Sequence, residues 1–149
     1  MPTLLFYRGR RSENPSATFW DNFICFVTRS RYSHVELAFF NLDANHMCWS
    51  SSTRDDGVRY KRIYVDYSKW DAVPIQLDKD DSFFLQHEGK GYDYMGLIGT
   101  VIALPIFSRK NKWFCSEIIA AFFGLSNPWS YTPEDLYKLY AKGLKPGCI

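Results

Sequence analysis

The stretch that decides the fold lies in the last third of the chain and reads Trp113-Phe114-Cys115-Ser116-Glu117-Ile118-Ile119-Ala120-Ala121-Phe122-Phe123-Gly124. From Glu117 its large apolar residues recur at spacings of three and four, which predicts a helix with one apolar face. Gly124 is typical of a helix C-terminus. Cys115 falls at the predicted helix start, which we expect to be exposed. The unpaired N–H groups and the dipole there favour a thiolate and could hold an oxyanion.

Two interpretations of Cys115 follow from these residues alone. It is a candidate nucleophile because of its place at a helix start. It is also a candidate core residue, since free cysteines are among the most buried residue types. A second stretch, around His34, bears on the choice.

Composition indicates a soluble, globular protein with a single domain spanning residues 1–149. The chain has 149 residues, of which 46% are hydrophobic and 23% charged. Its formal net charge of +2 is too small to indicate a nucleic-acid partner. The four cysteines form no C-x-x-C pair, so a zinc ribbon or a thioredoxin motif is not expected. We expect no cofactor and no metal.

We expect neither a signal peptide nor a membrane span in this chain. Its N-terminus has no long apolar core after a basic start, and the longest apolar run, around Met95 to Phe107, is too short to cross a bilayer. We therefore expect a cytoplasmic protein, a phage-encoded protein or a virion-associated one.

The order of predicted elements indicates an α+β fold, with a curved antiparallel sheet packed by helices. Alternation and turn signals predict five strands, at Thr3–Tyr7, His34–Phe40, His46–Ser51, Val58–Val65 and Trp70–Leu77. Helical spacing predicts five helices, at Thr18–Thr28, Lys79–Glu88, Tyr94–Ile106, Glu117–Phe123 and Pro133–Lys142.

His34 begins a strand whose partner we expect to follow the turn at Asn41–Asn45. Pairing across that turn sets Phe40 against His46, Ala38 against Cys48 and Glu36 against Ser50. A slip of two residues would instead set His34 against Ser50 and would leave the same side chains on one face. One face then carries four polar or reactive side chains, those of His34, Glu36, Cys48 and Ser50. His34 on this face suits a general base, with Glu36 or Ser50 as the acceptor that orients its ring. A buried, hydrogen-bonded structural histidine is the alternative.

A metal site is a rival interpretation of the same face, because His34, Glu36, His46 and Cys48 are all possible ligands. However, His34 and His46 are expected at opposite ends of the hairpin, too far apart to bind one ion.

Several pieces of the chain together resemble the permuted papain-like amidases, the YiiX-like branch of the NlpC-type cysteine peptidase superfamily. These pieces are Tyr32-Ser33-His34-Val35-Glu36-Leu37, Trp49-Ser50-Ser51-Ser52, Gly57-Val58-Arg59, Gly91-Tyr92-Asp93-Tyr94 and Trp113-Phe114-Cys115-Ser116-Glu117. The resemblance runs from about Thr3 to Tyr140. In ordinary papain-like enzymes the cysteine helix precedes the histidine strand, whereas here His34 precedes Cys115, as in the permuted branch.

The resemblance implies a circularly permuted papain-like fold and a cysteine hydrolase. Cys115 would attack a carbonyl and His34 would take its proton. The family often has His, Glu, Gln or Asn as the orienting residue, at a place that here falls near Trp49 or Ser50. Ser50 would fill that role weakly, and Glu36 could replace it from the same strand as His34. Substrates across the superfamily include peptidoglycan peptides, other amides and acyl lipids, and the sequence does not select among them.

Two other functions are compatible with the same residues. The fold could serve as a non-catalytic binding or structural module. Alternatively, the chain could be a lipid acyl hydrolase or transferase similar to the LRAT-like enzymes, which share the permuted order. An apolar surface near Trp113, Phe107 and Ile106 would favour the lipid enzyme.

Overall fold

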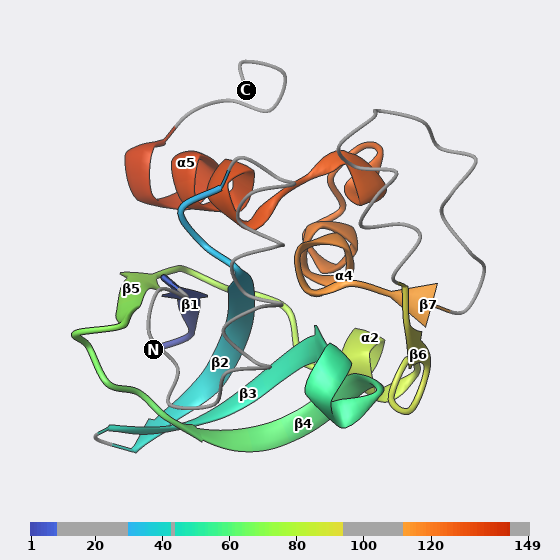
Figure 1. Cartoon of the computed structure of the whole chain (residues 1–149), viewed down its shortest axis with the longest axis horizontal. Coiled ribbons are helices and arrows are strands. Elements are labelled where there is room, and N and C mark those ends of the chain that lie inside the picture. The colour runs from blue at the N-terminus through green and yellow to red at the C-terminus, as the bar shows by residue number, and fades with distance from the viewer. Residues whose placement is uncertain (9–29, 43, 94–111, 144–149) are drawn as a thin grey trace.

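The computed structural model describes residues 1–8, 30–42, 44–93 and 112–143 (Figure 1). Two of the expected helices, Thr18–Thr28 and Tyr94–Ile106, lie outside these ranges, as do Cys25 and Cys148. The described residues form a mixed α and β structure with an antiparallel five-stranded sheet, which agrees with the expected α+β class.

The sheet has the strand order β4-β3-β2-β1-β5. Its strands are β1 (Thr3–Tyr7), β2 (His34–Leu42), β3 (Asn45–Ser52), β4 (Gly57–Tyr64) and β5 (Trp70–Pro74). Every neighbouring pair is antiparallel. All five strands lie within two or three residues of their predicted bounds, because alternating apolar residues and flanking turn residues mark them clearly.

The β2–β3 register agrees with the prediction on one side of an irregularity and differs on the other. Ala38 pairs with Cys48, as expected, but Phe40 pairs with Met47 instead of His46. The register shifts between Ala38 and Phe40, which is the mark of a β-bulge. The extra residue shortens the predicted turn, and the strands continue to Leu42 and from Asn45.

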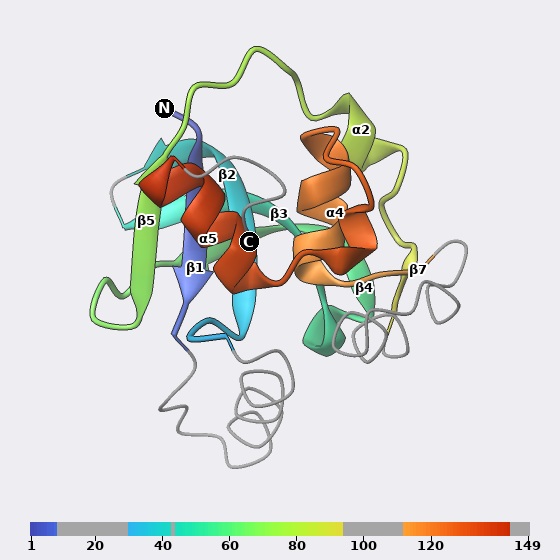
Figure 2. The same cartoon turned by 90° about the horizontal axis from the view of Figure 1, so that it is seen from above.

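Helices cover one face of the sheet, as seen from above in Figure 2. They are α2 (Ser82–Leu85), α4 (Cys115–Phe122) and α5 (Pro133–Lys142). The main core joins their apolar residues to Leu4, Phe6, Val35, Leu37 and Trp49 of the sheet. A smaller cluster on the opposite face contains Leu5, Ala38, Cys48 and Val65. Side-chain alternation along each strand produces this division.

The observed helix ends agree with the sequence prediction for α5 and differ from it for α2. α5 begins and ends where predicted, because Thr132 accepts from the Asp135 amide and Gly143 closes the helix at φ 65°. α2 is much shorter than the expected Lys79–Glu88, because hydrogen-bonded turns from His87 to Phe84 and from Lys90 to His87 replace its second half.

Two short strands connect the sheet to the start of α4. β6 (Gly91–Tyr92) and β7 (Lys112–Trp113) pair in parallel, and β7 leads directly into Cys115. The Val58 amide of β4 donates to the Lys90 carbonyl at 2.9 Å, just before β6. Of the helices in the described ranges, none has the length and apolar character needed to cross a membrane.

Candidate active site

Cys115 is the first residue of α4, as the sequence pattern predicted, but the helix start is not exposed. Cys115 is only 3% exposed and belongs to the main core. The start of the helix is held against the sheet, because the Ser51 hydroxyl of β3 donates to the Trp113 carbonyl at 2.6 Å. The Glu117 carboxylate accepts from the Phe114 amide at 3.4 Å, so the Phe-Cys-Ser-Glu sequence encodes part of its own cap.

His34 stands at the beginning of β2, where it meets both Glu36 and Cys115. Its Nε2 lies 2.8 Å from Oε1 of Glu36, two residues along the same strand. Burial would disfavour the imidazolium, but the charge of Cys115, then that of Glu36, and hydrogen bonds with both raise the pKa of His34 to about 10. Because Nε2 is engaged by Glu36, Nδ1 is the ring nitrogen left for the sulfur. The His34 side chain keeps 20% of its surface exposed.

Glu36 also binds Arg59 of β4 through both carboxylate oxygens. Nη1 of Arg59 lies 2.7 Å from Oε2, and Nη2 lies 2.5 Å from Oε1. The two side chains are 1% and 14% exposed, so the pair is largely shielded from water. Burial alone would raise the pKa of Glu36, but the bonds and charges of Arg59 and His34 lower it to about 2.

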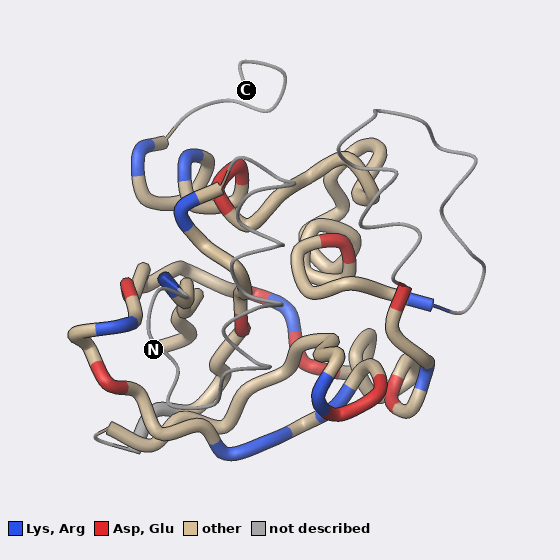
Figure 3. The backbone as a smooth tube through the Cα atoms, viewed as in Figure 1, with Lys and Arg blue, Asp and Glu red and all other residues tan. Residues whose placement is uncertain are grey.

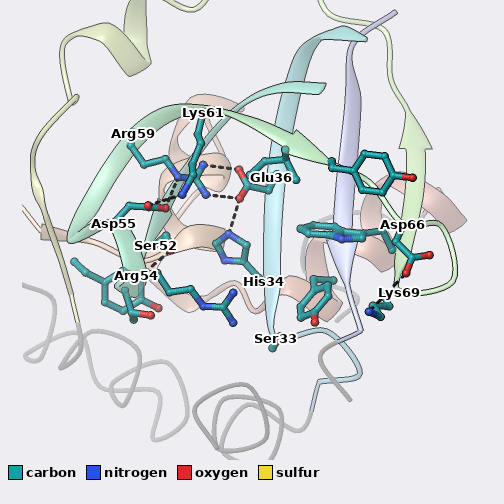
Figure 4. A pocket seen from close by; sticks show the side chains of 16 residues that line it. Ser33, His34, Glu36, Ser52, Arg54, Asp55, Arg59, Lys61, Asp66 and Lys69 are labelled. Carbon is teal, nitrogen blue, oxygen red and sulfur yellow. Dashed lines mark hydrogen bonds and ion pairs between the residues drawn. The ribbon is translucent and has the colours of Figure 1, made fainter. Parts of the chain in front are cut away.

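The ionic contacts continue beyond Arg59 to the 3₁₀ turn η1 (Thr53–Asp55) (Figure 4). Nε of Arg59 lies 2.9 Å from Oδ2 of Asp55, and Nζ of Lys61 lies 2.7 Å from Oδ1 of the same carboxylate. Figure 3 shows basic and acidic positions side by side where η1 meets β4. The result is one row of alternating charges, from Lys61 through Asp55, Arg59 and Glu36 to His34.

Ser50 is placed differently from its predicted role. Its hydroxyl donates to the Val35 carbonyl at 2.7 Å, and Glu36 is the acceptor that contacts the imidazole. Ser50 pairs with Arg59 across β3 and β4, and β3 lies between β2 and β4. A small residue at this position leaves room for the longer Glu36 and Arg59 side chains to meet above it.

The other candidates from the polar face do not join the site. Cys48 is fully buried in the smaller cluster, where burial, and then the charge of Glu36, raise the pKa of its thiol. His46 contacts the Tyr67 hydroxyl at 3.3 Å, away from His34. Within the described ranges, no group of three or more His, Cys, Asp or Glu side chains is arranged to hold a metal ion.

A cavity of about 490 Å³ opens beside His34 on the face of the sheet that carries Glu36. All five strands of the sheet, β6 and the turns beside β4 contribute residues to its lining, which include Tyr7, His34, Glu36, Arg59, Lys61 and Trp70. In Figure 4 the Arg59, Lys61 and Asp55 side chains lie on one side of His34, with Asp66 and Lys69 on the other. Cys115 is not one of the described lining residues, so the cavity reaches the site from the imidazole side.

Arg59 and Asp55 were not among the predicted site residues. Arg59 could have been found by extending the alternation argument to a third strand, since the register sets it opposite Ser50 on the polar face. Asp55 has no such signal, because its position depends on a 3₁₀ turn capped by Ser52.

Unpaired polar atoms also gather around the candidate residues. In the described part of the chain, three buried polar atoms have no hydrogen-bond partner, namely Oγ of Ser33, Nε1 of Trp113 and Oγ of Ser116. They flank His34 and Cys115 in the sequence. Buried unpaired polar groups are rare in folded proteins and call for an explanation, of which a functional site is one.

In comparisons with known proteins, no family model, no curated protein and no solved structure matches this chain. The assignment of function therefore depends on the geometry of the site and on the sequence resemblance.

Proposed function

We propose that this protein is a cysteine hydrolase that cleaves an amide or peptide bond, with a circularly permuted papain-like fold. The observation that carries the proposal is the position of His34, whose ring interacts with the Glu36 carboxylate and with Cys115 at the start of α4. A nucleophile, a base and an acceptor that orients the base are the parts that thiol hydrolysis requires.

The reaction would proceed through an acyl-enzyme. His34 takes the Cys115 proton, and the thiolate attacks the carbonyl carbon. First-turn amides of α4 stabilise the oxyanion. The imidazolium then protonates the leaving amine as the C–N bond breaks. Water, deprotonated by His34, attacks the thioester, and the carboxylic acid leaves as the sulfur is released. Glu36 stabilises the imidazolium in both halves.

Substrate class is proposed more broadly, as a peptide, peptidoglycan or another acyl compound. The cavity beside His34 presents both charged side chains and the rings of Tyr7 and Trp70, which suits a substrate with polar and aromatic groups. Ser33 also lines this cavity, although its unpaired hydroxyl is itself buried. Two of the residues expected to form a lipid-facing surface, Ile106 and Phe107, lie outside the described residues.

The first prediction is that Cys115→Ala abolishes hydrolysis and leaves the fold intact. Removing one sulfur should cost about 1 kcal/mol of unfolding free energy, whereas Phe122→Ala in the same helix should cost about 3–5 kcal/mol. The assay offers peptidoglycan fragments, isopeptides and acyl lipids to the wild type, to Cys115→Ala and to Cys48→Ala as a second buried-thiol control. Thermal melts of each variant accompany the assay. Hydrolysis that survives in Cys115→Ala would place the nucleophile elsewhere.

A non-catalytic binding module is the second candidate, and the burial of Cys115 favours it. A nucleophile that is 3% exposed must be reached through a narrow opening, whereas a core cysteine need not be reached at all. Failure of the wild type to cleave any class in the panel, together with no alkylation of Cys115 by iodoacetamide, would make the binding module the better assignment.

A further inference from the structure

We infer that Arg59 is a positioning residue of this site, whose guanidinium fixes the Glu36 carboxylate in the orientation that meets His34. The inference rests on the proposed function, since it assigns Arg59 a part in the same reaction. It goes beyond the predicted site, which comprised Cys115 and His34 with Glu36 or Ser50 as the acceptor.

The geometry of the pair is the first support. A carboxylate that accepts one hydrogen bond can rotate about its terminal torsion, whereas Arg59 contacts both oxygens of Glu36 at 2.5 and 2.7 Å. Bidentate arginine pairs fix direction as well as distance. Oε1 then serves Arg59 and His34 together, so the plane of the guanidinium sets where the imidazole finds its acceptor.

Asp55 binds the Nε edge of Arg59, away from the two terminal nitrogens that contact Glu36. Nε of Arg59 binds Asp55 Oδ2, while both terminal nitrogens face Glu36. Lys61 holds the other oxygen of Asp55. The guanidinium is thus held along two of its edges and has little freedom to turn away from Glu36.

Burial makes the pairing necessary. Glu36 is 1% exposed, so without a cation beside it the neutral carboxylic acid would be favoured. The groups that face Glu36 are His34 on β2, Cys48 on β3, Arg59 on β4 and Cys115 beyond His34 on α4. Arg59 is the permanent cation among them, because His34 must gain and lose its proton during the reaction.

The second prediction concerns the acid limb of Cys115 reactivity, that is, the pH range over which labelling of the thiol falls as the pH is lowered. Arg59→Gln should move this limb to higher pH. Without the guanidinium the pKa of Glu36 should rise by about one to three units, as expected on loss of an adjacent opposite charge. Glu36 is then protonated at a pH where it stays charged in the wild type. The His34 imidazolium loses its carboxylate partner, and it therefore stabilises the Cys115 thiolate less well. The measurement is the rate of iodoacetamide labelling of Cys115 from pH 3 to 8, read by peptide mass spectrometry, which requires no substrate.

Matched variants separate positioning from charge and from folding. Arg62→Gln removes the same charge from an exposed side chain of the same strand and should leave the acid limb in place. Arg59→Lys keeps the charge without the bidentate fork and should shift the limb by less than Arg59→Gln. If Arg59→Gln alone fails to fold, the double variant Glu36→Gln/Arg59→Gln removes both charges. The acid limb of Cys115 labelling in the double variant should coincide with that of Glu36→Gln alone, because the two residues act through one contact.

The outcomes distinguish the two proposals. An acid limb in folded Arg59→Gln that coincides with the wild type, or an equal shift in Arg62→Gln, overturns the role of Arg59. The role of Arg59 is also overturned if the double variant loses as much Cys115 labelling as the two single variants lose together. A third outcome separates the proposals: the wild type hydrolyses nothing in the panel, but the acid limb of Cys115 labelling moves in Arg59→Gln. This outcome overturns the proposed hydrolase and supports the positioning role of Arg59.

Discussion

Glu36 is a buried carboxylate that serves two cations at once, and this double contact determines how the site can work. Its Oε1 accepts from His34 and from Arg59, while Oε2 accepts from Arg59 alone. Arg59 keeps the carboxylate charged, and the carboxylate in turn stabilises a charged imidazole. Ser50, which sits between them in the sheet, supplies space and a hydrogen bond to Val35 instead of a charge.

The third prediction concerns this division of labour between Glu36 and Ser50. Glu36→Gln should lower kcat by about 10²–10⁴-fold, as for loss of the orienting group in other base-assisted nucleophiles. Ser50→Ala should leave kcat within a few-fold and instead lower stability by about 1–3 kcal/mol, because the buried Val35 carbonyl loses its donor. Steady-state rates and urea melts of both variants test this. Equal kcat values for Glu36→Gln and the wild type would remove Glu36 from the site.

At the residue scale, alternation along the strands was enough to predict part of the candidate site. It placed His34 and Glu36 on one face, and helical spacing placed Cys115 at the helix start. It could not select between Glu36 and Ser50 as acceptor, because both lie on that face in the predicted register. That choice depends on rotamers and on Arg59, which alternation within one hairpin does not include.

At the scale of elements, the start of α4 depends on a chain of backbone contacts that begins at Gly57. Gly57 has φ 135°, and a Cβ added there would lie 2.0 Å from the Lys90 carbonyl oxygen. This close approach lets Val58 bond Lys90 and brings β6 beside β4. β6 pairs with β7, and β7 ends at Trp113, two residues before the sulfur.

The fourth prediction is that Gly57→Ala destabilises the protein more than Gly89→Ala does. Both glycines have positive φ, and holding an Ala in such a sparsely populated conformation costs about 1–3 kcal/mol. Gly89 has open space around it, whereas the new methyl group at Gly57 meets backbone. Gly57→Ala should therefore also break the Val58–Lys90 hydrogen bond, which Gly89→Ala leaves in place. Since this bond helps to position β6, β7 and the start of α4, the labelling of Cys115 should slow as well. Melts and iodoacetamide labelling of both variants test this, and equal melting temperatures would contradict it.

The element scale also shows what local sequence cannot encode. Strand positions were predictable from alternation and turns, and α5 from its Thr-Pro start and Gly end. The bulge at Phe39 and the shortening of α2 were not, because each depends on pairing or turn contacts with distant parts of the chain. The burial of Cys115 belongs to the same class, since it results from β7 and from the Ser51 contact with Trp113.

At the scale of the whole molecule, a small net charge of +2 conceals a concentrated row of buried and half-buried charges. The row runs from β4 and the turn η1 to β2, and each member lies within hydrogen-bonding distance of the next. Pairs of this kind contribute to stability only while both partners keep their charge. The fold should therefore respond to pH through Glu36 on the acid side and through His34 on the alkaline side.

The fifth prediction gives the signs of that response. The pKa of Glu36 is lowered from 4.5 to about 2, so its stabilisation is present above about pH 4.5 and is lost as pH falls toward 2. The pKa of His34 is raised from 6.5 to about 10, so its stabilisation is present below about pH 6.5 and is lost as pH rises toward 10. From these two groups, the unfolding free energy should be greatest between about pH 4.5 and 6.5.

Urea unfolding at a series of pH values measures this curve, with Glu36→Gln/Arg59→Gln as the comparison. The double variant lacks the buried carboxylate, so its stability should fall less steeply than that of the wild type below pH 4.5. Its alkaline limb should also be shallower, because His34 loses one of the two anions that raise its pKa, while the Cys115 charge remains. An acid limb of unchanged slope in the double variant would mean that other carboxylates govern acid unfolding. The charge row would then act on the site alone.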